Sequence, residues 1–184
     1  MKANSQNLTT QNIPTLIKQL AIPASVGMFF NTMYNVVDTF YAGLISTQSV
    51  SALTLSFMIF FLIIGFGYGF SSAITALLGN SLGKKRYKLA SIYAHKGLIF
   101  VPIIGLILSI VGYFTSPYLF MLLGAKDEYL QISIDYINPI LFGAIFFMFN
   151  FSLNSILVAT GDTKTYRNSL IFGFFANLIL NPLF

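Results

Sequence analysis

The sequence has no cysteine, a single histidine (His95) and only five acidic residues among its 184. The missing thiols exclude disulfides and thiolate metal sites. One histidine and five acids cannot assemble a histidine-rich metal centre, and a Ser-His-Asp site would depend on His95 alone. We therefore expect neither an enzyme nor a bound cofactor.

Charge of either sign is also scarce, because only 15 residues are Asp, Glu, Lys or Arg. Water-soluble domains carry about 25% charged residues, so this composition indicates a membrane protein. Residues 1–12 are polar with one lysine, and the apolar stretch after them is far longer than a signal-peptide core. We expect that stretch to be kept as a transmembrane helix.

Long apolar runs are abundant in this chain, which is 56% hydrophobic. About 20 apolar residues span a bilayer, and uninterrupted runs favour helices over the alternating strands of a barrel. The runs predict an all-α integral membrane protein with about five transmembrane helices, at residues 16–44, 50–79, 89–115, 130–159 and 166–184. The fifth run reaches the last residue without a polar stop, so we expect the chain to be truncated in this helix.

Basic residues gather on one side of the predicted helices. Lys126 alone lies on the other side, against nine: Lys2, Lys18, Lys84, Lys85, Arg86, Lys88, Lys96, Lys164 and Arg167. Because basic loops stay in the cytoplasm, this asymmetry predicts a cytoplasmic N-terminus. The basic residues behind the net charge of +5 lie at the ends of the apolar spans. We therefore expect them to interact with the headgroups of a lipid bilayer rather than with nucleic acid.

Asp38 is the only charged residue between positions 20 and 44. A carboxylate at the centre of a bilayer costs about 2.5–3.5 kcal/mol, so an acid there indicates a functional site. Burial favours the neutral form of the acid and makes its protonation easy. We predict that Asp38 is a proton or cation switch.

Three asparagines fall near the predicted depth of Asp38. At 1.5 Å per residue, Asp38 lies about 27 Å along its helix, while Asn177 and Asn181 lie about 15 Å and 21 Å beyond Arg167. Asn35 shares the face of Asp38. A carboxylate with amides suits a proton or Na⁺, which Asp38 and Asn177 would bind. Alternatively, Asn177 and Asn181 only join helices, at about 0.6 kcal/mol each.

Proline and glycine mark two further positions within the apolar runs. Pro23 lies inside the first predicted helix, where a missing backbone hydrogen bond permits a bend. A tolerated proline without a mechanical role is the alternative. Gly65 and Gly69 form a pair of small residues four apart, which predicts close packing against another helix.

Several stretches together resemble the multidrug and toxic compound extrusion (MATE) transporters. Residues 34–39 with Gly43 resemble the acid motif of the family's first helix, and Pro23 stands where its bending proline does. Residues 78–83, 123–130 and 161–164 resemble its second-helix exit, its approach to helix four and its loop before helix five. Asn177 with Asn181-Pro182 resembles the polar motif of helix five.

The resemblance implies a twelve-helix transporter of two lobes, with this chain as an incomplete N-terminal six-helix lobe and the C-terminal lobe missing. It implies a multi-pass protein of the plasma (inner) membrane that exports amphipathic organic cations by antiport with H⁺ or Na⁺. The family's acid and proline map onto Asp38 and Pro23, and its polar pair onto Asn177 and Asn181. Many relatives carry Asp at the position of Asn181, so Asp38 is expected to titrate alone.

Two other functions fit the sequence. A lipid-linked oligosaccharide flippase of similar architecture would need a cationic cavity for phosphate, and the predicted spans contain no deep Lys or Arg. A membrane scaffold or interaction subunit without transport activity would fit a chain of this length. Seven further apolar spans in the coding sequence would favour the transporter.

Overall fold

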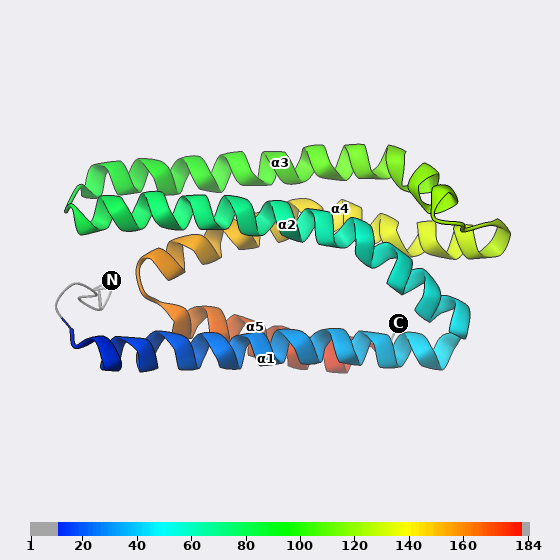
Figure 1. The fold of residues 1–184 in the computed structure, drawn as a ribbon, viewed down its shortest axis with the longest axis horizontal. Helices are drawn as coiled ribbons and strands as arrows, with labels where there is room; N and C mark the ends of the chain where they lie inside the picture. The colour runs from blue at the N-terminus through cyan, green and yellow to red at the C-terminus, as the bar shows by residue number, and fades with distance from the viewer. Residues whose placement is uncertain (1–10, 182–184) are drawn as a thin grey trace.

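A computed structural model describes residues 11–181 and consists there of five helices (Figure 1). They are α1 (Ile13–Ile45), α2 (Thr47–Gly83), α3 (Tyr87–Leu122), α4 (Asp127–Ala159) and α5 (Thr163–Leu180). Lys2, Pro182 and the end of the fifth predicted helix lie outside the described residues. The helices follow the predicted order, and the fold is the all-α arrangement that the apolar runs predict.

The helices are longer than predicted and the turns between them shorter. The largest difference concerns residues 116–129, which we expected to connect two helices and which the structure places largely within α3 and α4. The charged residues Lys126, Asp127 and Glu128 suggested a loop there. Leu119 and Phe120 instead continue the helix, and Phe120 is fully buried in the core. Burial of apolar side chains therefore outweighs the backbone hydrogen bond lost at Pro117.

Left-handed residues end three of the helices. Gly124 (φ +94°) follows α3 and Gly161 (φ +81°) follows α4, as glycine does in a Schellman turn. Lys85 (φ +57°) takes the same place after α2, although a side chain disfavours that conformation. In each turn a backbone N–H donates a hydrogen bond to a carbonyl oxygen in the last turn of the helix. The chain therefore reverses its direction within a few residues.

Side chains cap the starts of α2 and α5. Ser46 accepts a hydrogen bond from the Ser49 N–H at 3.0 Å. Asp162 accepts from the Thr165 N–H at 3.0 Å and from the Thr165 hydroxyl at 2.6 Å. These donors favour the charged carboxylate and hold the pKa of Asp162 below its ordinary value. The caps fix where each helix begins.

Helices α1 to α4 are each long and apolar enough to cross a membrane. At 1.5 Å per residue they run for about 50 Å or more, which exceeds the roughly 30 Å of hydrocarbon in a bilayer. Their ends therefore reach the headgroup layers. The described part of α5 has 18 residues and begins with polar and basic side chains, and it falls short of the same criterion.

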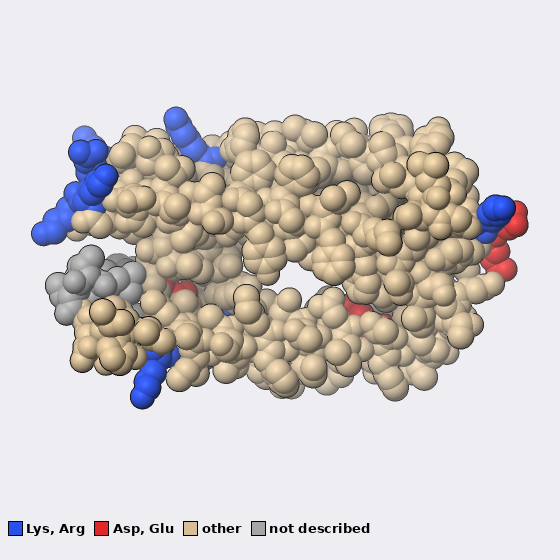
Figure 2. Space-filling model, in the orientation of Figure 1, with Lys and Arg blue, Asp and Glu red and all other residues tan. Residues whose placement is uncertain are grey.

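The helices form two groups. Helices α2, α3 and α4 pack together, while α1 lies along α5 and meets α2 only sparsely (Figure 1). The space-filling view shows an opening between the groups and basic side chains gathered at one end of the molecule (Figure 2). The α2–α3 and α4–α5 turns lie at that end, as the distribution of basic loops predicts.

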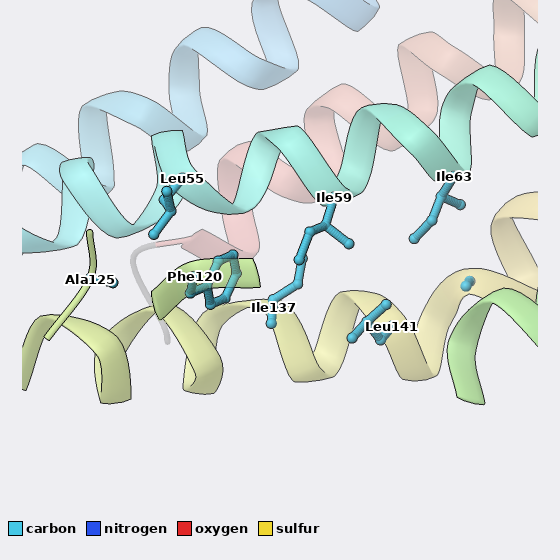
Figure 3. Close-up of a cluster of buried hydrophobic side chains, with 8 residues drawn as sticks. Leu55, Ile59, Ile63, Phe120, Ala125, Ile137 and Leu141 are labelled. Carbon is cyan, nitrogen blue, oxygen red and sulfur yellow. The ribbon is translucent and has the colours of Figure 1, made fainter. Parts of the chain in front are cut away.

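The core lies between α2, α3 and α4. Leu55, Ile59 and Ile63 of α2 point toward Ile137 and Leu141 of α4 in one buried cluster (Figure 3). Glycines bring the helices close together elsewhere. A Cβ at Gly105 of α3 would lie 3.0 Å from the Ala144 carbonyl oxygen of α4. The α2–α3–α4 group is therefore closely packed and supports the more open pair, α1 and α5.

Candidate functional site

Asp38 of α1 lies against two asparagines of α5. The Asn177 side-chain amide donates a hydrogen bond to Asp38 Oδ1 at 2.7 Å, and that of Asn181 donates to the same oxygen at 2.9 Å. The Asn181 amide also reaches Asn177 Oδ1 at 3.3 Å. Asn177 is buried, whereas Asp38 and Asn181 are half-buried. The structure thus brings together the three side chains that depth counting placed at one level.

Hydrogen bonding to Asp38 is one-sided. Both amide donors of α5 point at the same carboxylate oxygen, Oδ1. Within residues 11–181, the other oxygen, Oδ2, accepts no hydrogen bond from protein. Oδ1 is therefore held by α5, while Oδ2 is free to receive a proton or a cation without breaking either bond.

Asn35 does not join these contacts. Its side-chain amide donates to the Asn31 carbonyl oxygen, one turn back along α1, at 2.9 Å. The i, i+3 spacing from Asp38 gives both residues a similar face, but a local backbone acceptor is closer. A cation-binding role for Asn35 stays a prediction, and it requires the amide to turn away from Asn31.

Two tyrosines complete the surroundings of Asp38, and sequence reasoning did not select them. Tyr34 of α1 and Tyr136 of α4 both lie within electrostatic range of the Asp38 carboxylate. Tyr34 precedes Asp38 by four residues, a spacing that places both on one helical face. Tyr136 has no such signal, because its position depends on how α4 faces α1.

Oxygen atoms suited to a hard cation are present, although acids are few. Within the described residues no group of three His, Cys, Asp or Glu side chains could hold a metal ion. A cation at Asp38 would therefore rely on one carboxylate and on amide or hydroxyl oxygens. Asn177 Oδ1 accepts one hydrogen bond from Asn181 at 3.3 Å, and its second lone pair could bind Na⁺. A proton needs only Oδ2.

Pro23 is buried in α1, one helical turn before Gly27, where an added Cβ would meet Leu170 and Arg167 of α5. A proline lacks the N–H that would bond the carbonyl four residues earlier, which belongs to Gln19. The structure supplies another donor, because the Thr163 hydroxyl at the start of α5 lies 3.4 Å from the Gln19 carbonyl oxygen. The Thr163 hydroxyl thus bonds α1 at the carbonyl that has lost its partner within the helix. This contact links the N-terminal part of α1 to the start of α5.

The glycine pair in α2 does not pack as predicted. A Cβ at Gly65 or Gly69 would meet nothing within 4 Å, and both residues are exposed. The close contact is made by Gly67, against the Phe151 ring of α4. The reason is helical rotation: residue 67 lies on the opposite face. Gly65 and Gly69 instead line an apolar surface hollow of about 490 Å³ between Phe61 and Ala73.

Comparison with known proteins connects this geometry to a family. The chain matches the MatE family model over residues 23–183. A FAD transporter of Shewanella oneidensis is 26% identical, and the match covers 96% of this chain and 39% of that protein. A probable multidrug resistance protein of Bacillus subtilis, YoeA, is 30% identical over 76% of this chain and 30% of its own length.

A solved structure shows the same fold. The outward-facing conformation of a multidrug resistance MATE transporter superposes with a TM-score of 0.93 and 27% identity, over 100% of this chain and 41% of that one. The present chain therefore spans about two-fifths of that structure and of the FAD transporter. Because the family model matches residues 23–183, which is most of the chain, this multi-pass membrane protein belongs to the MatE (MATE) family.

Proposed function

We propose that this chain forms the ion-coupling lobe of an antiporter that exports amphipathic organic cations in exchange for H⁺ or Na⁺. The observation that carries the proposal is the one-sided hydrogen bonding of Asp38, whose Oδ1 is held by Asn177 and Asn181. The C-terminal lobe would come from the remaining length of a protein as long as its relatives. Transport itself belongs to that whole protein.

The first step is loading of Asp38. The ionised carboxylate binds both α5 amides through charge-assisted hydrogen bonds, which are roughly twice as strong as neutral ones. A proton on Oδ2 removes the negative charge and weakens both bonds. The contact between α1 and α5 therefore depends on whether Asp38 is loaded, and the coupling ion gains a direct effect on helix packing.

The second step is a change in the shape of α1. Pro23 lies 15 residues before Asp38, about 22 Å along the helix, and it interrupts the backbone ladder there. Loosening of the α1–α5 contact at Asp38 would allow α1 to bend at Pro23, to close the lobe and to release the drug outward. One charge moved through the membrane potential supplies about 2.3 kcal/mol per 100 mV.

Charge near the site favours a cationic substrate. The sequence contains no Lys or Arg between Gln19 and Gly83, so the charge on this part of α1 and α2 is that of Asp38 alone. A phosphate-bearing substrate would be repelled there. The same argument weighs against a lipid-linked oligosaccharide flippase, whose pyrophosphate needs basic partners.

Export of a flavin dinucleotide is the second candidate, because one relative is a FAD transporter. Its pyrophosphate would require basic side chains from beyond the surroundings of Asp38, since Asp38 is the charged group of this site. Competition separates the two: an organic cation inhibits export of its own class, whereas FAD inhibits only a flavin exporter. Inhibition of dye export by FAD would favour the second candidate.

The test is drug resistance in cells that carry the full-length gene with Asp38→Asn. The variant keeps the size of the side chain but cannot exchange a proton, so we expect resistance to fall to the level of cells without the gene. Asn150→Ala is the matched control, because this exposed amide of α4 takes no part in the hydrogen bonds to Asp38. Undiminished efflux by Asp38→Asn at equal membrane expression would contradict the proposal.

A further inference from the structure

The α2–α3 turn carries Lys84, Lys85, Arg86 and Lys88 within five positions. Neither α2 nor α3 contains an acidic residue that could neutralise them. Asp162 lies in the α4–α5 turn at the same end of the molecule, but both of its carboxylate oxygens are bonded by Thr165 (Figure 1). This cluster therefore leaves a strong positive charge for an external anion.

Two of the four basic side chains line a surface pocket of about 320 Å³. Lys84 and Arg86 share it with Asn80 of α2 and Tyr93 of α3, whereas Lys85 and Lys88 do not line it. An ammonium, a guanidinium, an amide and a phenol thus face one space. Together they offer several hydrogen-bond donors, which suits the oxygens of a phosphate group.

The backbone of the turn sets this arrangement. The N–H of Lys85 bonds the Leu82 carbonyl and that of Arg86 bonds the Ser81 carbonyl, at 2.9 and 2.8 Å. Lys85 adopts φ +57° between them. Because the turn is closed by two hydrogen bonds, its backbone positions Lys84 and Arg86 so that both line the same pocket.

The pocket also has an apolar side. Leu77 and Leu89 line it, and Leu77 is 46% exposed. Ile92, further along α3, is 48% exposed. In a membrane these apolar surfaces face acyl chains, directly beside the basic turn at the end of the spanning helices. A soluble phosphate would use the donors but not this apolar flank.

From these observations we infer a binding site for an anionic phospholipid. Lys84, Arg86, Asn80 and Tyr93 bind the headgroup phosphate, and the acyl chains lie against the exposed side of α2 and α3. The site is remote from Asp38 and needs neither drug nor coupling ion. Its existence is independent of the proposed antiport, because binding can be measured without transport.

The test measures binding of fluorescent phosphatidylglycerol to the purified full-length protein in an uncharged detergent, with phosphatidylcholine as the neutral comparison. Lys84→Gln/Arg86→Gln removes the lining charges, and Lys85→Gln/Lys88→Gln removes the same net charge outside the pocket. We expect the lining variant to lose at least about tenfold more affinity than the outer variant, equivalent to about 1.4 kcal/mol. Melting without anionic lipid checks that both variants fold.

Three outcomes would overturn the assignment. Equal losses in the two double variants would indicate diffuse attraction to the basic turn. Equal binding of phosphatidylcholine would remove the role of headgroup charge, and displacement by inorganic phosphate at the same concentration as the lipid would assign the pocket to a soluble anion. If the lining variant does not fold, Arg86→Lys serves instead: it keeps the charge, loses the planar fork, and should weaken binding several-fold.

Discussion

At the scale of single residues, the site depends on how one carboxylate is held. Asp38 Oδ1 receives two amide hydrogen bonds from α5, and both amides belong to residues one helical turn apart. Hydrogen bonds to a charged group contribute about 1.5–3 kcal/mol, against about 0.6 kcal/mol for a polar contact between membrane helices. The two magnitudes separate an ion-binding site from ordinary helix contacts.

A double-mutant cycle measures this difference. We expect Asn177→Ala to lower the free energy of unfolding of the full-length protein by about 1.5–3 kcal/mol when Asp38 is present. In the Asp38→Asn background the same change should cost about 0.6 kcal/mol, because only a neutral contact is lost. Asn35→Ala, the matched amide deletion, should cost the same in both backgrounds. Equal costs for Asn177→Ala would show that its amide only joins two helices.

Much of this site could be predicted from the sequence because helical rise is fixed. Counting residues from the predicted helix ends placed Asp38, Asn177 and Asn181 at one level. The same count could not assign Tyr136, since the rotation of α4 about its axis depends on packing against α2 and α3. It also could not show that the Asn35 amide has an acceptor within its own helix.

At the scale of helices, packing determines where α3 ends and which face of α2 contacts its neighbour, and the amino-acid composition predicts neither. Residues 116–122 contain a proline yet extend α3, because Phe120 completes a buried cluster. The glycine pattern in α2 predicted a contact through Gly65 and Gly69, but Gly67 makes it. A pattern of small residues indicates that a helix can pack closely. Which face it uses is settled by the neighbouring helices.

Glycine substitutions test the packing of α3 on α4. Gly105→Ala would place a Cβ 3.0 Å from the backbone of both Ala144 and Ile145, which cannot turn aside as a side chain does. We expect a loss of about 1–3 kcal/mol in the free energy of unfolding. Gly69→Ala, with open space around it, should be neutral or stabilising by up to about 1 kcal/mol. Similar losses for both would contradict the described interface.

Pro23 leaves the Gln19 carbonyl without its backbone donor in α1, and we predict that the Thr163 hydroxyl of α5 compensates for this loss. Thr163→Val removes the hydroxyl that reaches the Gln19 carbonyl, so we expect it to cost about 1 kcal/mol of stability. In a Pro23→Ala background the new N–H serves that carbonyl, and the cost should shrink. Thr160→Val is the control, since its hydroxyl bonds carbonyls of α4 itself. An unchanged cost in the alanine background would show that Thr163 does not compensate for the proline.

At the scale of the whole molecule, the two helix groups have different characters. The α2–α3–α4 group is joined by buried side chains and close glycine contacts, whereas α1 and α5 meet it sparsely. Asp38 lies in the sparsely connected pair, α1 and α5. A site that must change its contacts during transport is expected in such a pair, because few core contacts resist the movement.

The charge distribution predicts how the chain is oriented in the membrane. The chain has no cysteine of its own, so single cysteines can be placed at chosen turns in a full-length protein freed of others. With a membrane-impermeant thiol reagent, we expect Lys126→Cys to react in intact cells and Lys85→Cys only after permeabilisation. The reverse pattern would place the N-terminus outside.

The most direct test of the account is ion-coupled transport by the purified full-length protein in liposomes. An imposed gradient of H⁺ or Na⁺ should drive movement of an organic cation dye in the wild type, and the counter-movement of the ion should be detectable when dye is added. Asp38→Asn should bind dye but show no dependence on either gradient. Gradient-driven transport by Asp38→Asn at the wild-type rate would contradict the claim that Asp38 carries the coupling ion.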